Sequence, residues 1–196
     1  MTFEGVDGSG KTTQARLLER HLSGLGREVV MTREPGGTEL GERVRELVLH
    51  GPPISVWAEA ALFAASRAEH AAEVIRPALD RGADVVCDRF IDSSLAYQGI
   101  ARGLGLDEVE RLNLTVLEGL LPDRTFVLAV DAATAAGRRE DAPDRIEREG
   151  ESFQAEVGRA YELLAERFPD RIVLLDGSLP EDELAALVRA GVEDLL

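Results

Sequence analysis

The segment from Gly5 to Thr12 carries the strongest chemical signal in the sequence, because its letters, GVDGSGKT, fit the phosphate-binding pattern G-x-x-x-x-G-K-[ST]. Glycines in such a loop let backbone N–H groups converge on a phosphate, and the helix that follows presents the positive end of its dipole. We therefore expect the loop residues Gly5, Val6, Asp7, Gly8, Ser9 and Gly10 to bind nucleotide phosphates. Lys11 can reach the β and γ oxygens, and Thr12 can hold Mg²⁺. A glycine turn without a ligand is the alternative interpretation.

Lys11 is also unusual as a residue type in this chain. Of the 22 basic residues, 21 are arginines and Lys11 is the single lysine. A sequence that otherwise avoids lysine has it where the motif requires it, which favours the phosphate-binding interpretation. Genome composition and a hot habitat are both open explanations of the arginine excess.

Asp88 and Arg89 come at the end of the apolar run Val85-Val86-Cys87, which predicts a buried strand. In a protein with such a phosphate loop, an acid at this place can orient the Mg²⁺ shell, usually through water. The arginine beside it can neutralise charge that develops on a transferred phosphoryl group. A turn with a solvated ion pair is the alternative.

Three further segments could recognise the second substrate of a phosphoryl transfer. Arg33, in Arg33-Glu34-Pro35-Gly36-Gly37-Thr38, follows a predicted strand and could clamp a phosphate. Phe63 and Arg67 are four residues apart on a predicted helix, so a ring could stack on a base while a guanidinium donates to its edge. The segment from Asp92 to Gly99, followed by Arg102, collects hydroxyls, an amide and a cation. Each segment has a structural alternative. Arg33 could belong to a simple Pro-Gly turn, Phe63 could be a core ring beside a surface arginine, and the segment from Asp92 could be an ordinary loop.

Apolar runs alternate with helical patterns along the chain, which predicts an α/β fold with a parallel sheet flanked by helices. The five predicted strands span Thr2–Glu4, Glu28–Thr32, Ala83–Cys87, Thr125–Val130 and Arg171–Leu175. Helices are predicted after the phosphate loop up to Gly26, over Leu40–Leu49, over Val56 to about Arg81 with a kink at Pro77, and near Asp107–Leu120, Glu151–Arg167 and Glu181–Leu195. Residues 131–150 have few apolar side chains and four arginines, at 138, 139, 145 and 148, which suggests a mobile flap.

Composition bounds the class of protein. The chain has 196 residues and a formal net charge of −15, which argues against nucleic acid or an anionic membrane as a partner. With no apolar run of about 18 residues, no signal peptide and a single cysteine, Cys87, the sequence leads us to expect one cytoplasmic domain. Only four residues precede Gly5, so a start upstream of Met1 is an open alternative.

The motifs taken together resemble those of thymidylate kinase, the P-loop family that phosphorylates dTMP. The resemblance covers most of the chain and rests on Phe3 to Gln14, Thr32 to Thr38, Asp88-Arg89-Phe90, Ser94 to Gly99 and Asp144-Arg145-Ile146-Glu147, in this order and spacing. It implies the P-loop nucleoside monophosphate kinase fold with a five-stranded parallel sheet. It also implies a homodimer that transfers a phosphoryl group from ATP to dTMP with Mg²⁺, in dTTP synthesis.

The resemblance also implies roles for individual residues. Asp7 is expected near the 3′-hydroxyl of dTMP, and Arg33 and Arg89 on its phosphate, with Arg89 also serving the transition state. Phe63 would stack on thymine while Arg67 contacts its O4 atom. Ser94 and Gln98 would lie beside the nucleotide, and Tyr97 would crowd the 2′ position of the sugar and so favour deoxyribose. Mg²⁺ would be held by Thr12 and Asp88.

Gly8 indicates which of two forms of the family the chain resembles. Some members carry an arginine inside the phosphate loop, whereas this chain has Gly8 there and arginines in the flap. It therefore resembles the form whose lid, here about residues 131–150, supplies the catalytic cation. We expect Arg145 to be that residue, with Arg138 and Arg139 as alternatives on the ATP side.

Other proteins with a phosphate loop of this kind are alternatives to a thymidylate kinase. A GTP-dependent switch normally reads guanine with an Asn-Lys-x-Asp motif, which this chain lacks because it has no second lysine. A kinase for another monophosphate would share the architecture but not the Arg-Glu-Pro-Gly-Gly-Thr and Ala-Tyr-Gln-Gly segments. An inactive nucleotide-binding module is the non-enzyme alternative, and the joint presence of Lys11, Thr12, Asp88 and Arg89 argues against it.

Overall fold

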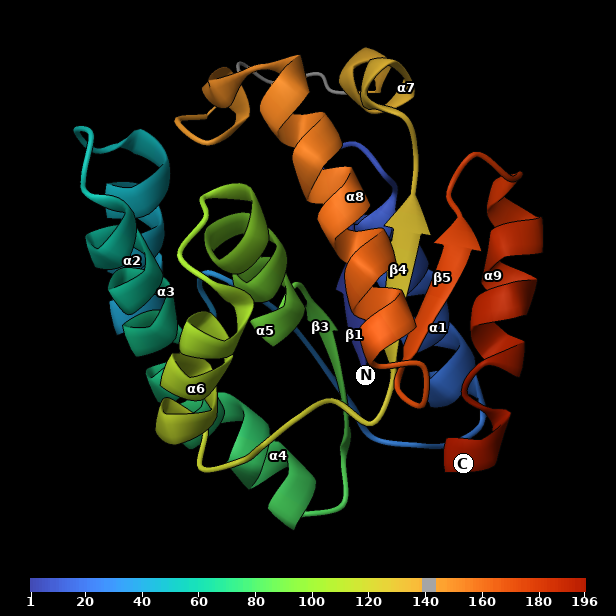
Figure 1. Cartoon of the computed structure of the whole chain (residues 1–196). Coiled ribbons are helices and arrows are strands. Elements are labelled where there is room, and N and C mark those ends of the chain that lie inside the picture. The colour runs from blue at the N-terminus through green and yellow to red at the C-terminus, as the bar shows by residue number, and fades with distance from the viewer. Residues whose placement is uncertain (139–143) are drawn as a thin grey trace.

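The computed structural model describes residues 1–138 and 144–196, and these form a five-stranded sheet flanked by helices (Figure 1). The strands are β1 (Thr2–Glu4), β2 (Val29–Arg33), β3 (Asp84–Asp88), β4 (Thr125–Ala129) and β5 (Ile172–Asp176). Their order is β2-β3-β1-β4-β5, and every neighbouring pair is parallel. The predicted α/β fold and its five-stranded parallel sheet are confirmed, with strand limits that differ from the prediction by one residue at most.

The middle of the sheet is buried on both faces, because the central residues of its inner strands are apolar. In β3, Val85 and Cys87 pack into a core on one face, and Val86 packs into a second core on the other. In β1 and β4, the Phe3 and Phe126 rings lie 5.4 Å apart within that second core. Continuous apolar runs of this kind are typical of parallel strands covered on both sides.

Two layers of helix cover the sheet (Figure 1). Helices α1 (Lys11–Gly24) and α9 (Glu181–Ala190) pack against each other on one face. Helix α8 (Glu151–Arg167) crosses the opposite face over β4 and β5. The remaining regular elements on this side include α2 (Glu39–His50) and α6 (Leu106–Val116). The final turn η4 (Glu193–Leu195) follows α9.

The long helix predicted from Val56 is continuous but not uniform. It consists of α3 (Val56–His70), a π-helical turn η1 (Ala71–Ile75) and α4 (Arg76–Asp80). Pro77 lies in the first turn of α4. Because proline has no N–H to donate and its ring crowds the preceding turn, a wider turn ahead of it preserves the helical path.

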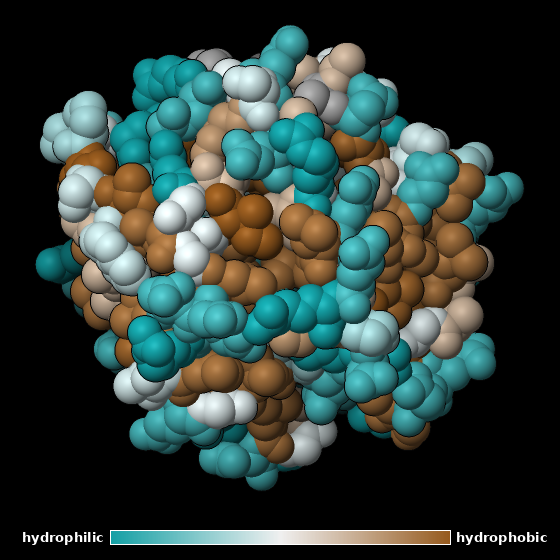
Figure 2. All heavy atoms as spheres, in the orientation of Figure 1, coloured by the Kyte–Doolittle hydropathy of each residue, from teal (hydrophilic) through white to brown (hydrophobic). Residues whose placement is uncertain are grey.

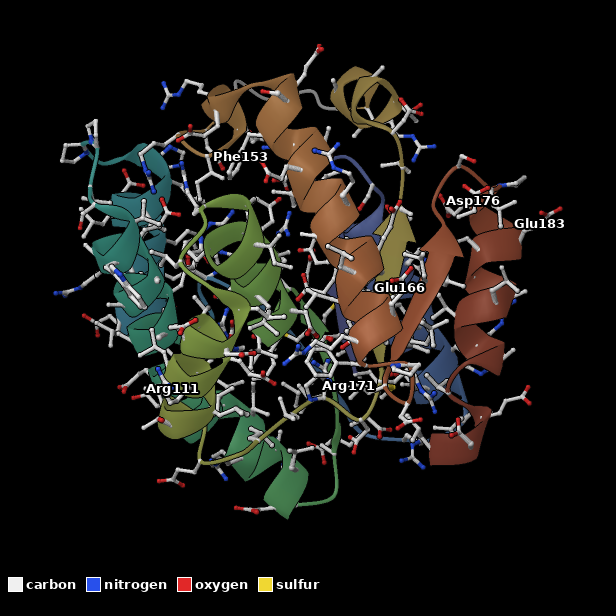
Figure 3. The ribbon with its side chains drawn as sticks, in the orientation of Figure 1. Arg111, Phe153, Glu166, Arg171, Asp176 and Glu183 are labelled. Atoms are coloured by element: carbon white, nitrogen blue, oxygen red, sulfur yellow. The ribbon has the colours of Figure 1, made fainter. Side chains whose placement is uncertain are left out.

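The segment after β3, for which an ordinary loop was the alternative, is helical. It forms α5 (Ile91–Ser94) and a π-helical stretch η2 (Leu95–Ala101). Asp92 is completely buried and accepts hydrogen bonds from Arg171 Nη1 and Nη2 at 2.6 and 2.7 Å. Arg171 lies below α8 where the chain enters β5 (Figure 3), so this ion pair joins α5 to the start of β5.

The predicted flap contains regular structure in its described parts. Helix α7 (Ala132–Gly137) follows β4, and its N-cap Asp131 accepts a hydrogen bond from the Thr134 amide at 2.9 Å. A 3₁₀ turn, η3 (Glu147–Glu149), precedes α8. Within the described parts of the chain, every helix is too short or too polar to cross a membrane.

Candidate functional site

The carboxyl ends of the strands carry the predicted site. Arg33 ends β2 and is the register partner of Asp88 at the end of β3, and the phosphate loop follows β1. The cavities that the described residues form at this edge include a small pocket and a wider neighbouring cleft. Both are lined by Asp7, Glu34, Arg45 and Arg89. These four residues mark the place where ligands in the two cavities would meet.

Close packing accounts for the glycines of the phosphate loop. Gly8 has φ +88°, and a Cβ atom there would lie 2.2 Å from the carbonyl oxygen of Ala135 in α7. Gly5 has φ +134°, and its Cβ would lie 2.7 Å from the Leu128 carbonyl oxygen. Both positions require glycine, because a side chain would meet backbone that cannot move aside. An arginine at Gly8 is incompatible with α7 in this position.

Three charged residues meet beneath the two cavities. Arg89 Nη2 donates to Asp7 Oδ1 at 2.7 Å, and Lys11 Nζ lies 3.6 Å from the same oxygen. Lys11 also donates to the Val6 carbonyl oxygen at 2.8 Å. Burial alone would raise the pKa of Asp7, but Arg89 and Lys11 outweigh it and hold that pKa well below the usual range. Burial and Arg89 lower the pKa of Lys11. Asp7 is thus an anion between two cations.

Arg89 is held in place from several sides. Its backbone has φ +69°, a left-handed conformation that few arginines adopt. Its Nη1 donates to Ser93 Oγ at 3.1 Å and to Tyr161 Oη at 3.3 Å. Ser93 and Tyr161 in turn donate to Glu4 Oε2, at 2.6 and 2.8 Å. The guanidinium is therefore positioned by a buried hydrogen-bond network that ends at the carboxylate of Glu4.

Glu4 predicts a pH dependence of stability. Burial, with the nearby Asp92 charge, raises its pKa from 4.5 to about 7 in spite of Arg89. Between these two values the unfolded chain loses this proton more readily than the folded chain, so Glu4 contributes stability below about pH 4.5 that is lost as the pH rises to 7. The free energy of unfolding of the wild type, minus that of Glu4→Gln, should fall by about 3 kcal/mol between pH 4.5 and 8. Urea denaturation at a series of pH values measures this difference, and parallel curves for the two proteins would contradict it.

Thr12 and Asp88 provide oxygen ligands at the floor of the wider cleft. Thr12 Oγ1 donates to Asp88 Oδ2, and both residues line the cleft beside Lys11. A hydroxyl and a carboxylate are hard oxygen donors of the kind that Mg²⁺ prefers. Mg²⁺ needs only one or two protein groups when phosphates supply the rest. Within residues 1–138 and 144–196, no group of three or more His, Cys, Asp or Glu could hold a metal. The two residues fit a magnesium ion bound together with a nucleotide.

Arg67 lies at the opposite end of the smaller pocket and is 1% exposed. Its Nε donates to Glu34 Oε2 at 2.7 Å, and its Nη2 donates to the Phe90 carbonyl oxygen at 3.0 Å. Its Nη1 donates to Ser94 Oγ at 2.9 Å and also to Asn113 Oδ1. One of its five N–H groups therefore has no partner among the described residues, and this group can donate to a ligand in the pocket.

Glu34, which holds Arg67, is itself buried and shared with a histidine. Its Oε1 lies 2.9 Å from His70 Nδ1, and His70 Nε2 lies 2.7 Å from Thr32 Oγ1. His70 is completely buried. The polar network behind the pocket thus runs from β2 through α3 to Arg67 and holds the guanidinium through Glu34.

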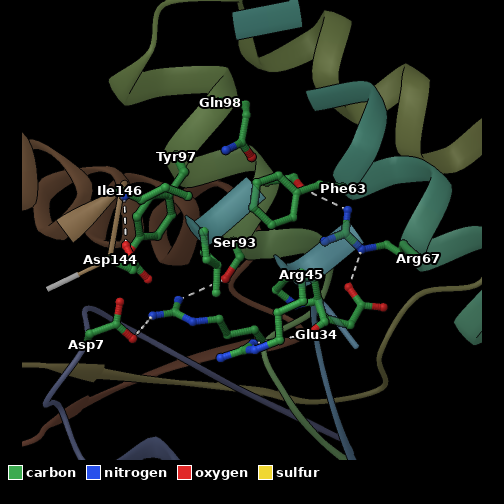
Figure 4. Close-up of a pocket in the computed structure, with 14 residues that line it drawn as sticks. Asp7, Glu34, Arg45, Phe63, Arg67, Ser93, Tyr97, Gln98, Asp144 and Ile146 are labelled. Carbon is green, nitrogen blue, oxygen red and sulfur yellow. Dashed lines mark hydrogen bonds and ion pairs between the residues drawn. The ribbon is translucent and has the colours of Figure 1, made fainter. Parts of the chain in front are cut away.

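The other predicted ligand contacts also line this pocket (Figure 4). Phe63 and Tyr97 place their rings on one side of it, with Gln98 beside them, while Asp7 lies on the other. The Tyr97 hydroxyl is buried and has no hydrogen-bond partner among the described residues. Burial raises the pKa of this hydroxyl, so it stays protonated and can donate. The pocket combines rings for a flat base with unused polar groups at its edges.

The structure brings Arg45 into the site, whereas Arg33 is engaged at its margin. Arg33 lines only the wider cleft and donates from Nη2 to both carboxylate oxygens of Glu42 at 3.0 Å. Arg45 lines both cavities, and its Nη1 donates to the Pro35 carbonyl oxygen at 3.1 Å. Burial, together with the charges of Arg33 and Arg89, lowers the pKa of Arg45. The motif analysis did not identify Arg45, because it is one of two arginines on a helix of ordinary composition.

The lid arginines lie in different environments. Arg138 lines the wider cleft and donates to the Gly177 carbonyl oxygen at 3.0 Å. Arg145 donates to Glu59 Oε2 and to the Val48 carbonyl oxygen, each at 2.7 Å, and lines neither cavity. Arg139 lies outside the described residues. Of the predicted cations, the structure brings Arg138 but not Arg145 to the phosphate loop.

Similar proteins are known for nearly the whole chain. A family model described as thymidylate kinase matches residues 3–188. A thymidylate kinase of Leifsonia xyli subsp. xyli is 52% identical, over 98% of this chain and 93% of that protein. One of Pelotomaculum thermopropionicum is 46% identical, over 100% of this chain and 93% of that protein. The crystal structure of thymidylate kinase from Ehrlichia chaffeensis superposes with a TM-score of 0.83 at 34% identity, covering 98% of this chain and 97% of that one.

Proposed function

This chain belongs to the thymidylate kinase family, and we propose that its two joined cavities hold the substrates of that family, dTMP and ATP. The family activity is that of an ATP-dependent nucleoside monophosphate kinase, which converts dTMP to dTDP. One observation carries the assignment of the site: Asp7, Arg45 and Arg89 line both cavities, so a phosphate in the smaller pocket would face one on the phosphate loop. In the cell this reaction serves dTTP synthesis in the cytoplasm.

ATP occupies the wider cleft in this proposal. The amide groups from Gly5 to Gly10 and the N-terminus of α1 hold its phosphates, and Lys11 pairs with the β and γ oxygens. Thr12 would help to hold Mg²⁺ through its hydroxyl, and Asp88 through its carboxylate. Bound there, Mg²⁺ would neutralise charge on the β and γ phosphates. The donor atoms of Thr12 and Asp88, and their place beside Lys11, support this arrangement.

The smaller pocket holds dTMP. Phe63 stacks on the base, and the unused N–H of Arg67 donates to its O4 atom. Tyr97 packs against the sugar and leaves little room for a 2′-hydroxyl, while Asp7 accepts from the 3′-hydroxyl. Ser94 holds Arg67, and Gln98 lines the base end of the pocket. Arg45 and Arg89 bind the acceptor phosphate, and Arg33 joins them from the margin of the cleft.

Transfer is direct and in line, without a covalent intermediate, because the carboxylates between the cavities are held in ion pairs, Asp7 with Arg89 and Lys11 and Glu34 with Arg67. Lys11, Arg45 and Arg89 bring the two phosphates together in spite of their mutual repulsion. They also stabilise the charge that spreads over the transferred group in the transition state. Their positions are set before the substrates bind, so little reorganisation is needed at the reactive geometry.

In this proposal, Arg138 is the lid arginine that supplies positive charge to the phosphates of ATP. Its place in the wider cleft supports this role, whereas Arg145 is bound to Glu59 and Val48. The steric exclusion of an arginine at Gly8 supports the lid-arginine form of the family. Arg138→Ala should lower kcat about 100-fold, and Arg145→Ala should leave kcat within about tenfold. Steady-state rates at saturating ATP and dTMP measure both, and the reverse order would assign the role to Arg145.

A homodimer is proposed through α3. The exposed small residues Ala58, Ala61 and Ala65 lie along one side of this helix, and Trp57 beside them is 50% exposed. Figure 2 shows apolar surface at its left edge, where α2 and α3 lie in Figure 1. Ala61→Arg should convert a dimer to a monomer, because a charge would be buried at the centre of the interface. Light scattering after gel filtration measures the mass. Ala186→Arg, on the exposed side of α9, should leave the mass unchanged, and a dimeric Ala61→Arg would contradict this interface.

The function is tested by ADP release with ATP and Mg²⁺. We would offer dTMP, dUMP, UMP, CMP, AMP and GMP in parallel to the wild type and to a Lys11→Ala control. Turnover should be greatest with dTMP and lost in the control, with dUMP lower by about tenfold to hundredfold, as the loss of one methyl contact allows. Turnover confined to another monophosphate would contradict the base pocket, and nucleotide binding without turnover would contradict the enzyme.

A further inference from the structure

Glu59 of α3 is a buried carboxylate outside both cavities. Its side chain is 2% exposed, and its oxygens accept hydrogen bonds from three residues that follow it at long sequence separation. Gln98 Nε2 donates to Oε1 at 2.9 Å, and Arg145 Nη2 donates to Oε2 at 2.7 Å. Arg102 donates to both oxygens at 3.4 Å. Glu59 therefore joins α3 to η2 and to the segment that precedes η3.

Glu59 is the shared counter-ion of two partly buried arginines, so its replacement would leave their charges poorly compensated. Arg102 and Arg145 are only 14% and 13% exposed, and both guanidinium groups face this one carboxylate. Arg102 also pairs with Glu149 at 2.7 Å and lies over the ring of Phe153, 4.8 Å from its centroid. Phe153 is near the start of α8, above η2 (Figure 3). Without the charge of Glu59, two partly buried cations would be left with a single exposed counter-charge.

The partners of Glu59 form two walls of the smaller pocket. Gln98 lines it directly. Arg145 does not line the pocket, but its neighbours Asp144 and Ile146 do. Two further hydrogen bonds hold this segment: the Arg145 amide donates to the Leu49 carbonyl oxygen at 2.9 Å, and Arg145 Nε donates to the Val48 carbonyl oxygen. Figure 4 shows Gln98 and Ile146 on either side of the Tyr97 ring. One carboxylate thus lies behind both walls.

We propose that Glu59 is a positioning residue for the acceptor nucleotide: through Gln98 and Arg145 it holds two walls of the monophosphate pocket and so sets the affinity for dTMP without touching it. This inference rests on the proposed assignment of that pocket to dTMP. Glu59 lies far from the phosphate loop along the chain and lines no part of the ATP cleft. Its loss should therefore act on dTMP binding and leave ATP binding unchanged.

The first variant is Glu59→Gln, which keeps the size of the side chain and removes its charge. We expect the KM and the calorimetric Kd for dTMP to rise about tenfold or more, because the residues that line the pocket lose the group that holds them in place. The KM for ATP and kcat at saturating dTMP should stay within about threefold. The matched control is Asp84→Asn. This variant breaks a comparable carboxylate–arginine pair, with Arg27, at the amino end of β3, and should leave both KM values unchanged.

The second test is a double-mutant cycle with Arg145→Gln. If Glu59 acts through Arg145, the single variants should raise the KM for dTMP by similar factors, and the double variant should raise it by less than their product. A wild-type KM for dTMP in Glu59→Gln, or a double effect equal to the product, would overturn the proposal. Phe63→Ala separates this result from failure of the proposed pocket. If Phe63→Ala raises the KM and Glu59→Gln does not, the role of Glu59 alone fails, and if neither does, the pocket assignment fails first.

Discussion

Arg89→Ala should lower kcat by about 10³-fold or more, which corresponds to about 4 kcal/mol of lost transition-state stabilisation. Arg89 lines both cavities and donates to Asp7 at 2.7 Å, so its guanidinium lies where the transferred phosphoryl group would pass. Ser93, Tyr161 and Glu4 hold it there before any substrate binds. A cation fixed in advance stabilises a transition state more than one that must first be ordered.

Rapid-quench measurement of a single turnover would test this prediction on the chemical step itself. Arg27→Ala provides the control, because Arg27 pairs with Asp84 at the opposite edge of the sheet and should affect only stability. Arg89→Lys should recover part of the rate, because a lysine keeps the charge but loses the fork of donors. A single-turnover rate for Arg89→Ala within tenfold of the wild type would remove Arg89 from the transition state.

Arg67→Met should abolish measurable dTMP binding and lower the free energy of unfolding by about 3 to 5 kcal/mol. Arg67 is 1% exposed and is the partner of the buried Glu34 carboxylate at 2.7 Å. Removing the guanidinium leaves that carboxylate without its counter-ion, with only His70 nearby. It also removes the N–H that we assign to the base. Urea denaturation and calorimetric titration with dTMP measure the two effects.

A compensating variant separates these two effects. In Arg67→Met with Glu34→Gln, neither charge of the pair remains, so much of the lost stability should return. Binding of dTMP should not return, because the donor to the base is still absent. A double variant that bound dTMP as well as the wild type would show that Arg67 serves the fold alone. Phe63→Leu, which keeps an apolar side chain in the pocket, should weaken dTMP binding with little change in stability.

The two predictions reflect a common arrangement of the site. Three buried carboxylates each hold an arginine: Glu4 is linked to Arg89, Glu34 to Arg67 and Glu59 to Arg145. Arginine suits this arrangement, because its rigid fork can be fixed by several acceptors and still present one N–H to a ligand. The arrangement is consistent with a pocket whose shape is set before its substrate arrives.

The sequence by itself determined the parts of this protein whose chemistry is continuous along the chain. The phosphate-loop motif is built from successive residues, so spacing alone predicts it, and the structure places Gly5 to Gly10 between β1 and α1, which begins at Lys11. The five strands were also predicted, because an apolar run between helical patterns has few other interpretations. The place of Asp88 in the site was predicted because it ends β3, and the carboxyl ends of parallel strands lie at the same edge of a sheet.

Tertiary structure decided which distant residues meet. Arg45 and Glu59 lie on helices of ordinary composition, and no local pattern marks them, since their roles depend on segments far along the chain. The same holds for Arg145, which the sequence favoured as the lid cation and the structure places against Glu59. The helical state of residues 91–101 depended on burial of Ile91, Leu95 and Ala96 in a core that forms only on folding. Pairings of this kind are set by packing, which a local sequence pattern does not contain.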